Sequence, residues 1–259
     1  MNELVKNQQM AYETSYDKRG LEAYTCHYTK DTWIRFVRDR RLHMAVKELS
    51  SHFKVKLEEI KDWKVLVVCG GVGGEGLFFL NQGFSSVTVS DFSYHALETC
   101  KHLDPRLKTM FADCENIDLE ENSFDLVVVQ DGLHHLSRPA LGLTEMLRVA
   151  SKAVIVIEPH TGVVSKYMGR EWEDHDGIIN YVFRWNNSIL VQTSKSYLLA
   201  RASYIKCLRF WNHTFAISPF VAFLPKKYKV KGAKVIYGLL DTIFPFLGNQ
   251  MIGIIEKKN

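Results

Sequence analysis

The chain has 259 residues, a 46% share of hydrophobic residues and a formal net charge of +4. This length and apolar content support one large α/β domain with additions, and the mild positive charge neither requires nor excludes a nucleic-acid partner. The five cysteines lie far apart without a CxxC pair, which excludes a disulfide framework and a structural zinc site and predicts a reduced, cytoplasmic compartment.

Neither end of the chain predicts a membrane segment. The N-terminus lacks a basic region followed by an apolar core, so we expect no signal peptide. The most apolar late stretch, residues 235–255, is interrupted by Asp241, Pro245 and Gln250 among others, which argues against a membrane span.

Residues 1–60 are predicted to form an N-terminal helical cap. Asp31 or Thr32 is placed to cap a helix whose apolar positions run from Ile34 to Leu49 at partly helical spacing. Its basic face contains Arg35, Arg38, Arg40 and Arg41. We expect that face to be solvated, with anion binding as the alternative.

Residues 62–160 are predicted to alternate between strands and helices. Short β-branched or apolar runs suited to buried strands occur at Lys64–Cys69, Ser86–Ser90, Lys108–Ala112, Phe124–Gln130 and Ala153–Ile157. Segments with helical spacing lie between them, which predicts a parallel sheet with right-handed crossovers. Further strands are expected at Tyr204–Phe210 and Met251–Glu256, with a helix over Ala233–Ile243 between them.

The first predicted strand ends in a run of glycines, a pattern typical of a turn where a ligand approaches bare backbone. Gly71, Gly73 and Gly76 satisfy GxGxxG, so a dinucleotide oxidoreductase is one alternative. Asp91 ends the second strand, where its carboxylate can accept hydrogen bonds from ribose hydroxyls. It follows Gly76 by only fifteen residues, earlier than the dinucleotide pattern requires, and this favours a different nucleotide-type cofactor.

Five segments, taken in order, resemble the motifs of the class I S-adenosylmethionine-dependent methyltransferases. They are Val65–Gly73, Ser90–Ser93, Phe111–Glu115, Asn122–Leu136 and Val154–Pro159. The resemblance covers residues 62–160, and Met251–Lys257 is consistent with the family's antiparallel closing hairpin. It implies an α/β fold with a doubly wound, seven-stranded, mostly parallel sheet, an N-terminal helical cap and a lid inserted after the fifth strand. The methyltransferase domain would span residues 61–259, with an acceptor-binding lid at about 161–230.

The resemblance also implies S-adenosylmethionine as the cofactor and S-adenosylhomocysteine as the product. The implied cofactor-binding residues are Cys69, Gly70, Gly71, Gly73, Asp91, Phe92, Asp113, Cys114, Gln130 and Asp131. Two positions depart from the family, which usually has an acid where Val67 stands and a glycine where Cys69 stands. The acid ordinarily holds the methionyl ammonium group, and Asp131, Tyr12 or Tyr16 is a candidate to replace it.

Three histidines are candidates for the general base that deprotonates an acceptor hydroxyl. Histidine suits this task because its ordinary pKa of about 6.5 lies near the working pH. His134 and His135 follow the fourth strand, where the resemblance places the methyl group, and His160 follows the fifth. A loop histidine that serves only packing or hydrogen bonding is the alternative for each.

The expected lid contains three groups of side chains that suit ligand binding. Glu171, Glu173, His175 and Asp176 can bind a cation or a polyol, but we expect a solvated acidic loop and assign no metal site. Aromatic residues gather between Tyr181 and Phe220, either as a stacking surface or as the lid's own core. The cluster Lys226–Lys234 can meet phosphate, although a solvated loop is the ordinary interpretation.

These observations predict a methyltransferase that acts on a small-molecule acceptor, with a hydroxyl of a sugar or glycan precursor as the first candidate. RNA methylation is the alternative that the basic clusters favour, although no appended RNA-binding module is recognisable and nucleic acid is not the favoured partner. A non-catalytic binding or scaffold protein is a third hypothesis, motivated by Val67 and Cys69.

Overall fold

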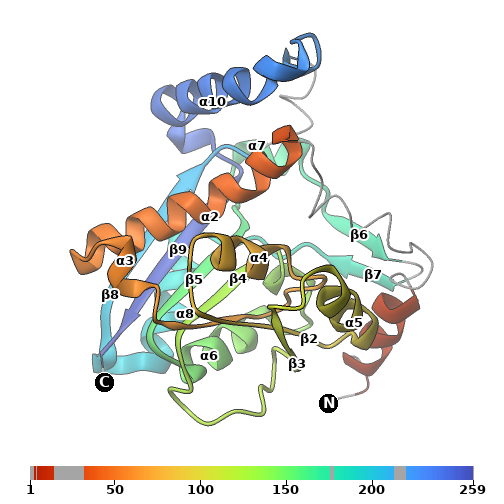
Figure 1. The fold of residues 1–259 in the computed structure, drawn as a ribbon, viewed down its shortest axis with the longest axis vertical. Coiled ribbons are helices and arrows are strands. Elements are labelled where there is room, and N and C mark those ends of the chain that lie inside the picture. The colour runs from red at the N-terminus through yellow and green to blue at the C-terminus, as the bar shows by residue number, and fades with distance from the viewer. Residues whose placement is uncertain (1–2, 4, 15–31, 176–177, 213–219, 259) are drawn as a thin grey trace.

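The computed structural model describes residues 3, 5–14, 32–175, 178–212 and 220–258. Its centre is a seven-stranded sheet flanked by helices on both faces (Figure 1). The strands are β1 (Lys64–Val67), β2 (Ser86–Asp91), β3 (Lys108–Phe111), β4 (Phe124–Gln130), β5 (Ala150–Pro159), β8 (Ala202–Phe210) and β9 (Gln250–Lys257).

The strand order is β3-β2-β1-β4-β5-β9-β8. The first five strands of this order are parallel to their neighbours, whereas β9 lies antiparallel between β5 and β8. The order reverses beside β1, so the loops after β1 and β4 diverge and leave a crevice at the carboxyl ends of the strands. The predicted doubly wound, mostly parallel seven-stranded sheet is therefore confirmed.

The central strands β1 and β4 have unbroken apolar runs at Val65–Val67 and Leu126–Val129 because both faces of the sheet are covered. Alternate residues of β1 point to opposite faces: Val65 and Val67 join one core cluster, and Leu66 joins the other. The same alternation continues in β4, where Val128 faces the first cluster and Val127 the second. Because successive side chains point to opposite faces and both faces are buried, these strands appear in the sequence as short unbroken apolar runs.

The first face of the sheet is covered by helices α2 (Thr32–Phe53), α4 (Gly74–Asn81) and α5 (Tyr94–Leu103). The second face is covered by α6 (Pro139–Val149) and α8 (Asn187–Leu198). The helix α2 contributes Leu42, Ala45 and Leu49 to the same core cluster as the strands, and α3 (Leu57–Ile60) follows it. Helix α2 thus packs into the main core, and the separation of a cap at residue 60 stays a prediction.

The segment between β5 and β8 contains α7 (Val163–Met168) and a hairpin of β6 (Trp172–His175) and β7 (Ile178–Tyr181). The expectation of an acidic loop is wrong for residues 172–175, because they pair with β7 as a strand; Asp176 lies outside the described residues. The hairpin forms a separate two-stranded sheet. Its role as an acceptor-binding lid stays a prediction.

The lysine cluster is helical, which corrects the interpretation of residues 226–234 as a loop. Helix α10 runs over Lys226–Ile243, and so begins seven residues before the predicted start at Ala233. Pro225 precedes its first turn, and lysine is a good helix former. Ala233 and Tyr237 pack with Val37 of α2, so burial on one side fixes the helix.

No helix in the described ranges is long and apolar enough to cross a membrane.

Candidate active site

A pocket of about 730 Å³ opens at the carboxyl ends of the parallel strands. Its walls come from the loops after β1, β2, β3 and β4 and from the N-terminal helical residues 5–14. The lining residues are Val5, Gln8, Tyr12, Cys69, Asp91, Phe92, Ala112, Asp113, Cys114, Glu115, Asp131, Gly132, His135 and Leu136. Apolar walls with a few convergent polar groups are typical of a cofactor site.

The glycine loop lies beside this pocket, which its first residue, Cys69, lines. The backbone turns through left-handed φ angles at Cys69 (50°), Gly71 (49°) and Gly73 (87°) before α4 begins at Gly74. A left-handed φ explains why a glycine suits the position of Cys69, since a cysteine there costs roughly 1 kcal/mol. The protein nevertheless has a cysteine at this position, and Cys69 lines the pocket.

Asp91 lies at the end of β2 and fixes the glycine loop. Its carboxylate accepts hydrogen bonds from the backbone N–H of Gly71 and of Ser93, both at 2.9 Å. Burial raises the pKa of Asp91 to about 6, and the two backbone donors oppose that rise. Each carboxylate oxygen keeps a second lone pair, so Asp91 can still accept bonds from a diol at pH 7 and above.

Part of the pocket wall suits a flat aromatic ring. Phe92 and Leu136 provide apolar surface, and Asp113, on the turn after β3, lines the same pocket. One oxygen of Asp113 accepts the backbone N–H of Glu115 at 2.9 Å. The buried Glu115 in turn accepts the Nε–H of Arg138 at 2.7 Å, which ties this turn to the start of α6.

The two adjacent histidines stand on a 3-10 turn, η1 (Leu133–His135), directly after β4. Glu158, which is fully buried at the end of β5, accepts the backbone N–H of Gly132 at 2.9 Å and of Leu133 at 2.7 Å. Its other oxygen lies 2.7 Å from Nδ1 of His134. Burial by itself would lower the pKa of His134, but the charge and hydrogen bond of Glu158 outweigh it and raise the pKa above its usual value.

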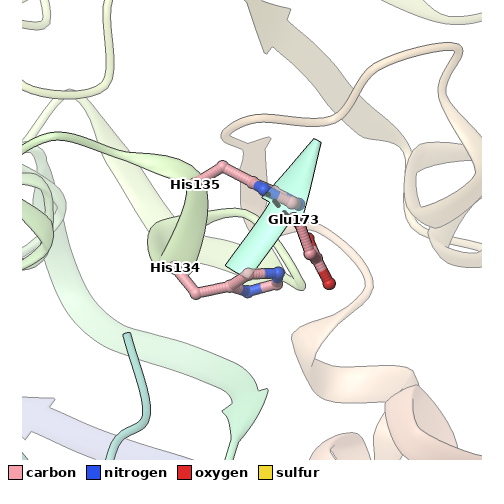
Figure 2. A group of neighbouring side chains, drawn as sticks. All are labelled: His134, His135 and Glu173. Atoms are coloured by element: carbon pink, nitrogen blue, oxygen red, sulfur yellow. Dashed lines mark ion pairs between the residues drawn. The ribbon is translucent and has the colours of Figure 1, made fainter. Parts of the chain in front are cut away.

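His135 forms a second carboxylate–histidine pair next to the first. Its Nδ1 lies 3.7 Å from a carboxylate oxygen of Glu173 on β6, and its ring centroid lies 4.0 Å from that of His134. Figure 2 shows both rings projecting from η1 toward Glu173. Ligand atoms of the three residues lie within 4.8 Å of one another, so proton transfer and cation binding are both chemically open to this group.

A polar cluster beside the pocket was not predicted from the sequence as a unit. Arg41 of α2 is buried and ion-paired with Asp131 at the end of β4, and Arg41 with the neighbouring histidines holds the Asp131 pKa below its usual value against the effect of burial. Gln130 donates to a carboxylate oxygen of Glu75 at 2.8 Å, and burial raises the pKa of Glu75. Among the described residues, Nε of Arg41 and Oε1 of Gln130 have no hydrogen-bond partner.

The helical residues 5–14 cover the mouth of the pocket. Gln8 donates to the backbone carbonyl of His135, and the ring of Tyr12 lies 5.6 Å from that of Phe92. The Glu13 carboxylate accepts Oγ–H of Ser93 at 2.9 Å and the backbone N–H of His95 at 3.0 Å, at the start of α5. A ligand in the pocket would therefore lie beneath this helix.

The predicted site residues separate into three groups. Seven of them line the pocket: Cys69, Asp91, Phe92, Asp113, Cys114, Asp131 and His135. Gly70, Gly71, Gly73, Gln130 and His134 lie in the loops or strand ends behind that surface. His160 is not among the lining residues; it pairs with Trp185, and burial and Arg209 lower its pKa to about 4. Tyr16 lies outside the described residues.

Comparison with known proteins agrees with this geometry. A family model described as a methyltransferase domain matches residues 67–157. A demethylmenaquinone methyltransferase from Renibacterium salmoninarum is 33% identical over 86 residues, which cover 33% of this chain and 36% of that protein. One from Clavibacter sepedonicus is 30% identical over 89 residues, with 33% and 36% covered. The chain thus matches about a third of the length of these curated relatives.

Solved structures share the fold at low sequence identity. An S-adenosylmethionine-dependent methyltransferase from Thermotoga maritima has a TM-score of 0.53 and 14% identity, covering 96% of this chain and 99% of that one. The YcgJ protein from Bacillus subtilis has a TM-score of 0.53 and 12% identity, covering 84% and 99%.

Residues 67–157 therefore match a methyltransferase domain, and the chain shares its fold with solved methyltransferase structures. S-adenosylmethionine is the cofactor named for the solved structure from Thermotoga maritima, and the pocket can be compared with it. The polar groups of the pocket fit this molecule. Asp91 suits the ribose diol, and Asp113 with the apolar surface of Phe92 suits the adenine. The charged pair of Arg41 and Asp131 suits the amino-acid end.

Proposed function

We propose that this chain transfers a methyl group from S-adenosylmethionine to a hydroxyl of a small-molecule acceptor, with a sugar or glycan precursor as the first candidate. The observation that supports a hydroxyl acceptor is the pair of histidines, each next to a carboxylate, with His135 on the pocket wall. The cofactor itself activates the methyl group, so with a hydroxyl acceptor the protein needs only to remove the hydroxyl proton.

The residues of the pocket divide the remaining work. When bound, the cofactor would supply a methyl carbon on a sulfonium, activated for transfer to the acceptor oxygen with the sulfur as leaving group. Asp91 orients the ribose, and Asp113 with Phe92 holds the adenine. Arg41, whose Nε lies buried without a partner among the described residues, receives the carboxylate of the amino-acid end, and Asp131 receives its ammonium group in place of the acid absent at Val67.

His135 is the proposed proton acceptor. It lines the pocket, whereas His134 is 5% exposed and has one ring nitrogen engaged by Glu158. The acceptor's proton passes to a ring nitrogen of His135, and the nearby Glu173 carboxylate stabilises the imidazolium that results. The ion is then deprotonated by water to restore the base.

The experiment measures formation of S-adenosylhomocysteine with sugar nucleotides, lipid-linked sugars, demethylmenaquinone and tRNA as acceptors. We expect turnover with a sugar hydroxyl and a loss of about 10²- to 10⁴-fold in kcat for His135→Asn, since general bases contribute about that much. In the unaltered chain we expect kcat to fall at low pH because a protonated base cannot accept the acceptor's proton. The His135→Asn variant should not show this fall. The exposed His102→Asn on α5 is the matched control.

Two results would contradict this assignment. Turnover with tRNA alone would establish RNA methylation in its place. Loss of activity in EDTA, restored by Mg²⁺ or Mn²⁺, would assign His134, His135 and Glu173 to a cation instead of a proton.

A further inference from the structure

Among the residues that the structure describes, helix α10 packs against α2 along one side. Figure 1 shows it beyond α2, on the side away from the sheet. Ala233 and Tyr237 are fully buried against α2. Arg40 of α2 pairs with Asp241 and lies 4.7 Å from the centre of the Tyr237 ring. These contacts fix the orientation of α10, so they also determine which side chains form its outer face.

The outer face of α10 is apolar over its second half. Val235, Leu239 and Ile243 recur at intervals of four residues and are 54%, 54% and 56% exposed. The 3-10 turn that follows α10 extends this surface with Phe246, which is 63% exposed. In the preceding segment, Phe223 is 89% exposed. Large apolar side chains gathered in this way on a protein surface mark an interaction site.

The first half of the same helix is strongly basic. Residues 220–248 contain five lysines, at 226, 227, 229, 231 and 234, and a single acid, Asp241. That acid is engaged on the inner side, since it pairs with Arg40 and accepts the backbone N–H of Trp211 at 2.8 Å. The outer face of this segment thus combines positive charge and apolar surface without an opposing carboxylate.

A basic groove continues this surface between α10 and α2. It has a volume of about 870 Å³, and its walls include Arg35, His43, Lys47 and Lys234. Its one acid, Asp39, lies 3.3 Å from the Arg35 guanidinium and is satisfied locally. A groove of this charge beside an apolar stripe suits a phosphate that is attached to a hydrocarbon chain.

We propose that this outer face of α10, with the groove beside it, binds the surface of an anionic lipid bilayer. The lysines attract the negatively charged headgroups, and Val235, Leu239, Ile243 and Phe246 enter the boundary between headgroups and acyl chains with the helix lying in the plane of the membrane. An acceptor dissolved in or anchored to the bilayer would then reach the enzyme by diffusion along the membrane. The binding itself does not rest on the proposed methyl transfer.

The composition of the face favours a bilayer over the two other partners that a basic or apolar surface can take. RNA is bound by cations and by aromatic rings that stack on bases. The stripe of Val235, Leu239 and Ile243 is aliphatic, and the exposed rings of Phe223 and Phe246 lie outside it, beyond the two ends of α10. A second copy of the chain would enclose the same five lysines in a symmetric interface without offering them a carboxylate, since Asp241 is engaged on the inner side of the helix.

The test is cosedimentation of the full chain with vesicles of phosphatidylcholine alone and of phosphatidylcholine mixed with phosphatidylglycerol. We expect binding to the mixed vesicles only, and weaker binding as salt is added. Two double variants separate the contributions of charge and apolar surface. Lys227→Glu with Lys231→Glu and, separately, Leu239→Gln with Ile243→Gln should each lower the partition coefficient at least about tenfold.

A matched control changes the same net charge elsewhere: Lys56→Glu with Lys195→Glu, both exposed and distant in sequence from α10. This variant should bind vesicles within about twofold of the unaltered chain, as expected for charges remote from the contact. Circular dichroism and the thermal midpoint confirm that each variant is folded.

Three results would overturn the proposal. The first is the absence of binding to anionic vesicles by the folded, unaltered chain. The second is equal binding by the Leu239→Gln, Ile243→Gln variant, which would leave only non-specific charge attraction. The third is a dimer in solution that this variant converts to a monomer, which would assign the face to a second copy of the chain.

Discussion

Glu158 is the residue on which the geometry of the histidines depends. Its buried carboxylate accepts hydrogen bonds from three backbone N–H groups of the turn after β4 and lies 2.7 Å from Nδ1 of His134. A carboxylate held without water is tolerated because each oxygen has donors. The same contacts place His135 on the wall of the pocket, so one residue of β5 sets the position of the proposed base on the loop after β4.

The raised pKa of His134 predicts a specific dependence of stability on pH. The folded state binds the His134 proton more tightly than the unfolded state, whose pKa is about 6.5. The stability that this proton contributes is therefore fully present below about pH 6.5 and is lost as the pH rises through the higher folded value. Urea unfolding between pH 6 and 9 should show a decline in the free energy of unfolding that is smaller in His134→Gln.

His102→Gln serves as the control for that measurement, because His102 is exposed on α5 and should leave the decline unchanged. An identical pH dependence in His134→Gln and the unaltered chain would contradict the assigned pairing of His134 with Glu158.

At the scale of elements, the helical residues 5–14 form the cover of the cofactor pocket. Val5, Gln8 and Tyr12 line that pocket, and Glu13 fixes the end of the helix by accepting N–H groups at the start of α5. A carboxylate at a helix N-terminus satisfies otherwise unpaired donors and complements the helix dipole. The position of the cover thus depends on a contact outside the pocket.

Replacing Glu13 with alanine should weaken cofactor binding without touching the pocket walls. Losing a cap of this kind costs about 1–2 kcal/mol, so the Kd for S-adenosylhomocysteine should rise by about tenfold, mainly through faster dissociation. Stopped-flow fluorescence with titration calorimetry measures both quantities. Glu98→Ala, exposed on the same α5, is the control, and an unchanged Kd in Glu13→Ala would show that the helix is not part of the binding site.

For the whole molecule, the order β3-β2-β1-β4-β5-β9-β8 brings four loop ends to one crevice and places β9 between β5 and β8. The sequence predicted this architecture because strands buried on both faces leave apolar runs that need no tertiary information, such as Phe124–Gln130, whose bounds are confirmed. Asp91 and His135 were predicted to be site residues because they directly follow such strands, and both line the pocket.

Other features depend on contacts between distant segments, so local pattern could not predict them. Arg41 was placed on a solvated face, yet it is buried and paired with Asp131, 90 residues later in the chain. Glu173 was assigned to a loop, and only pairing of β6 with β7 brings it to His135. The helix over Lys226–Lys234 was not predicted because the frequent lysines obscure its apolar side in the sequence pattern. Only the packing of α10 on α2 identifies that side.

The most direct test of the account is isothermal titration of the purified chain with S-adenosylhomocysteine at pH 7.5, above the pKa of Asp91 of about 6. NAD and the Asp91→Ala variant are titrated in parallel. We predict saturable binding of S-adenosylhomocysteine that Asp91→Ala abolishes, and no binding of NAD. Binding of NAD, or failure of the folded chain to bind S-adenosylhomocysteine, would contradict the conclusion that this pocket serves methyl transfer.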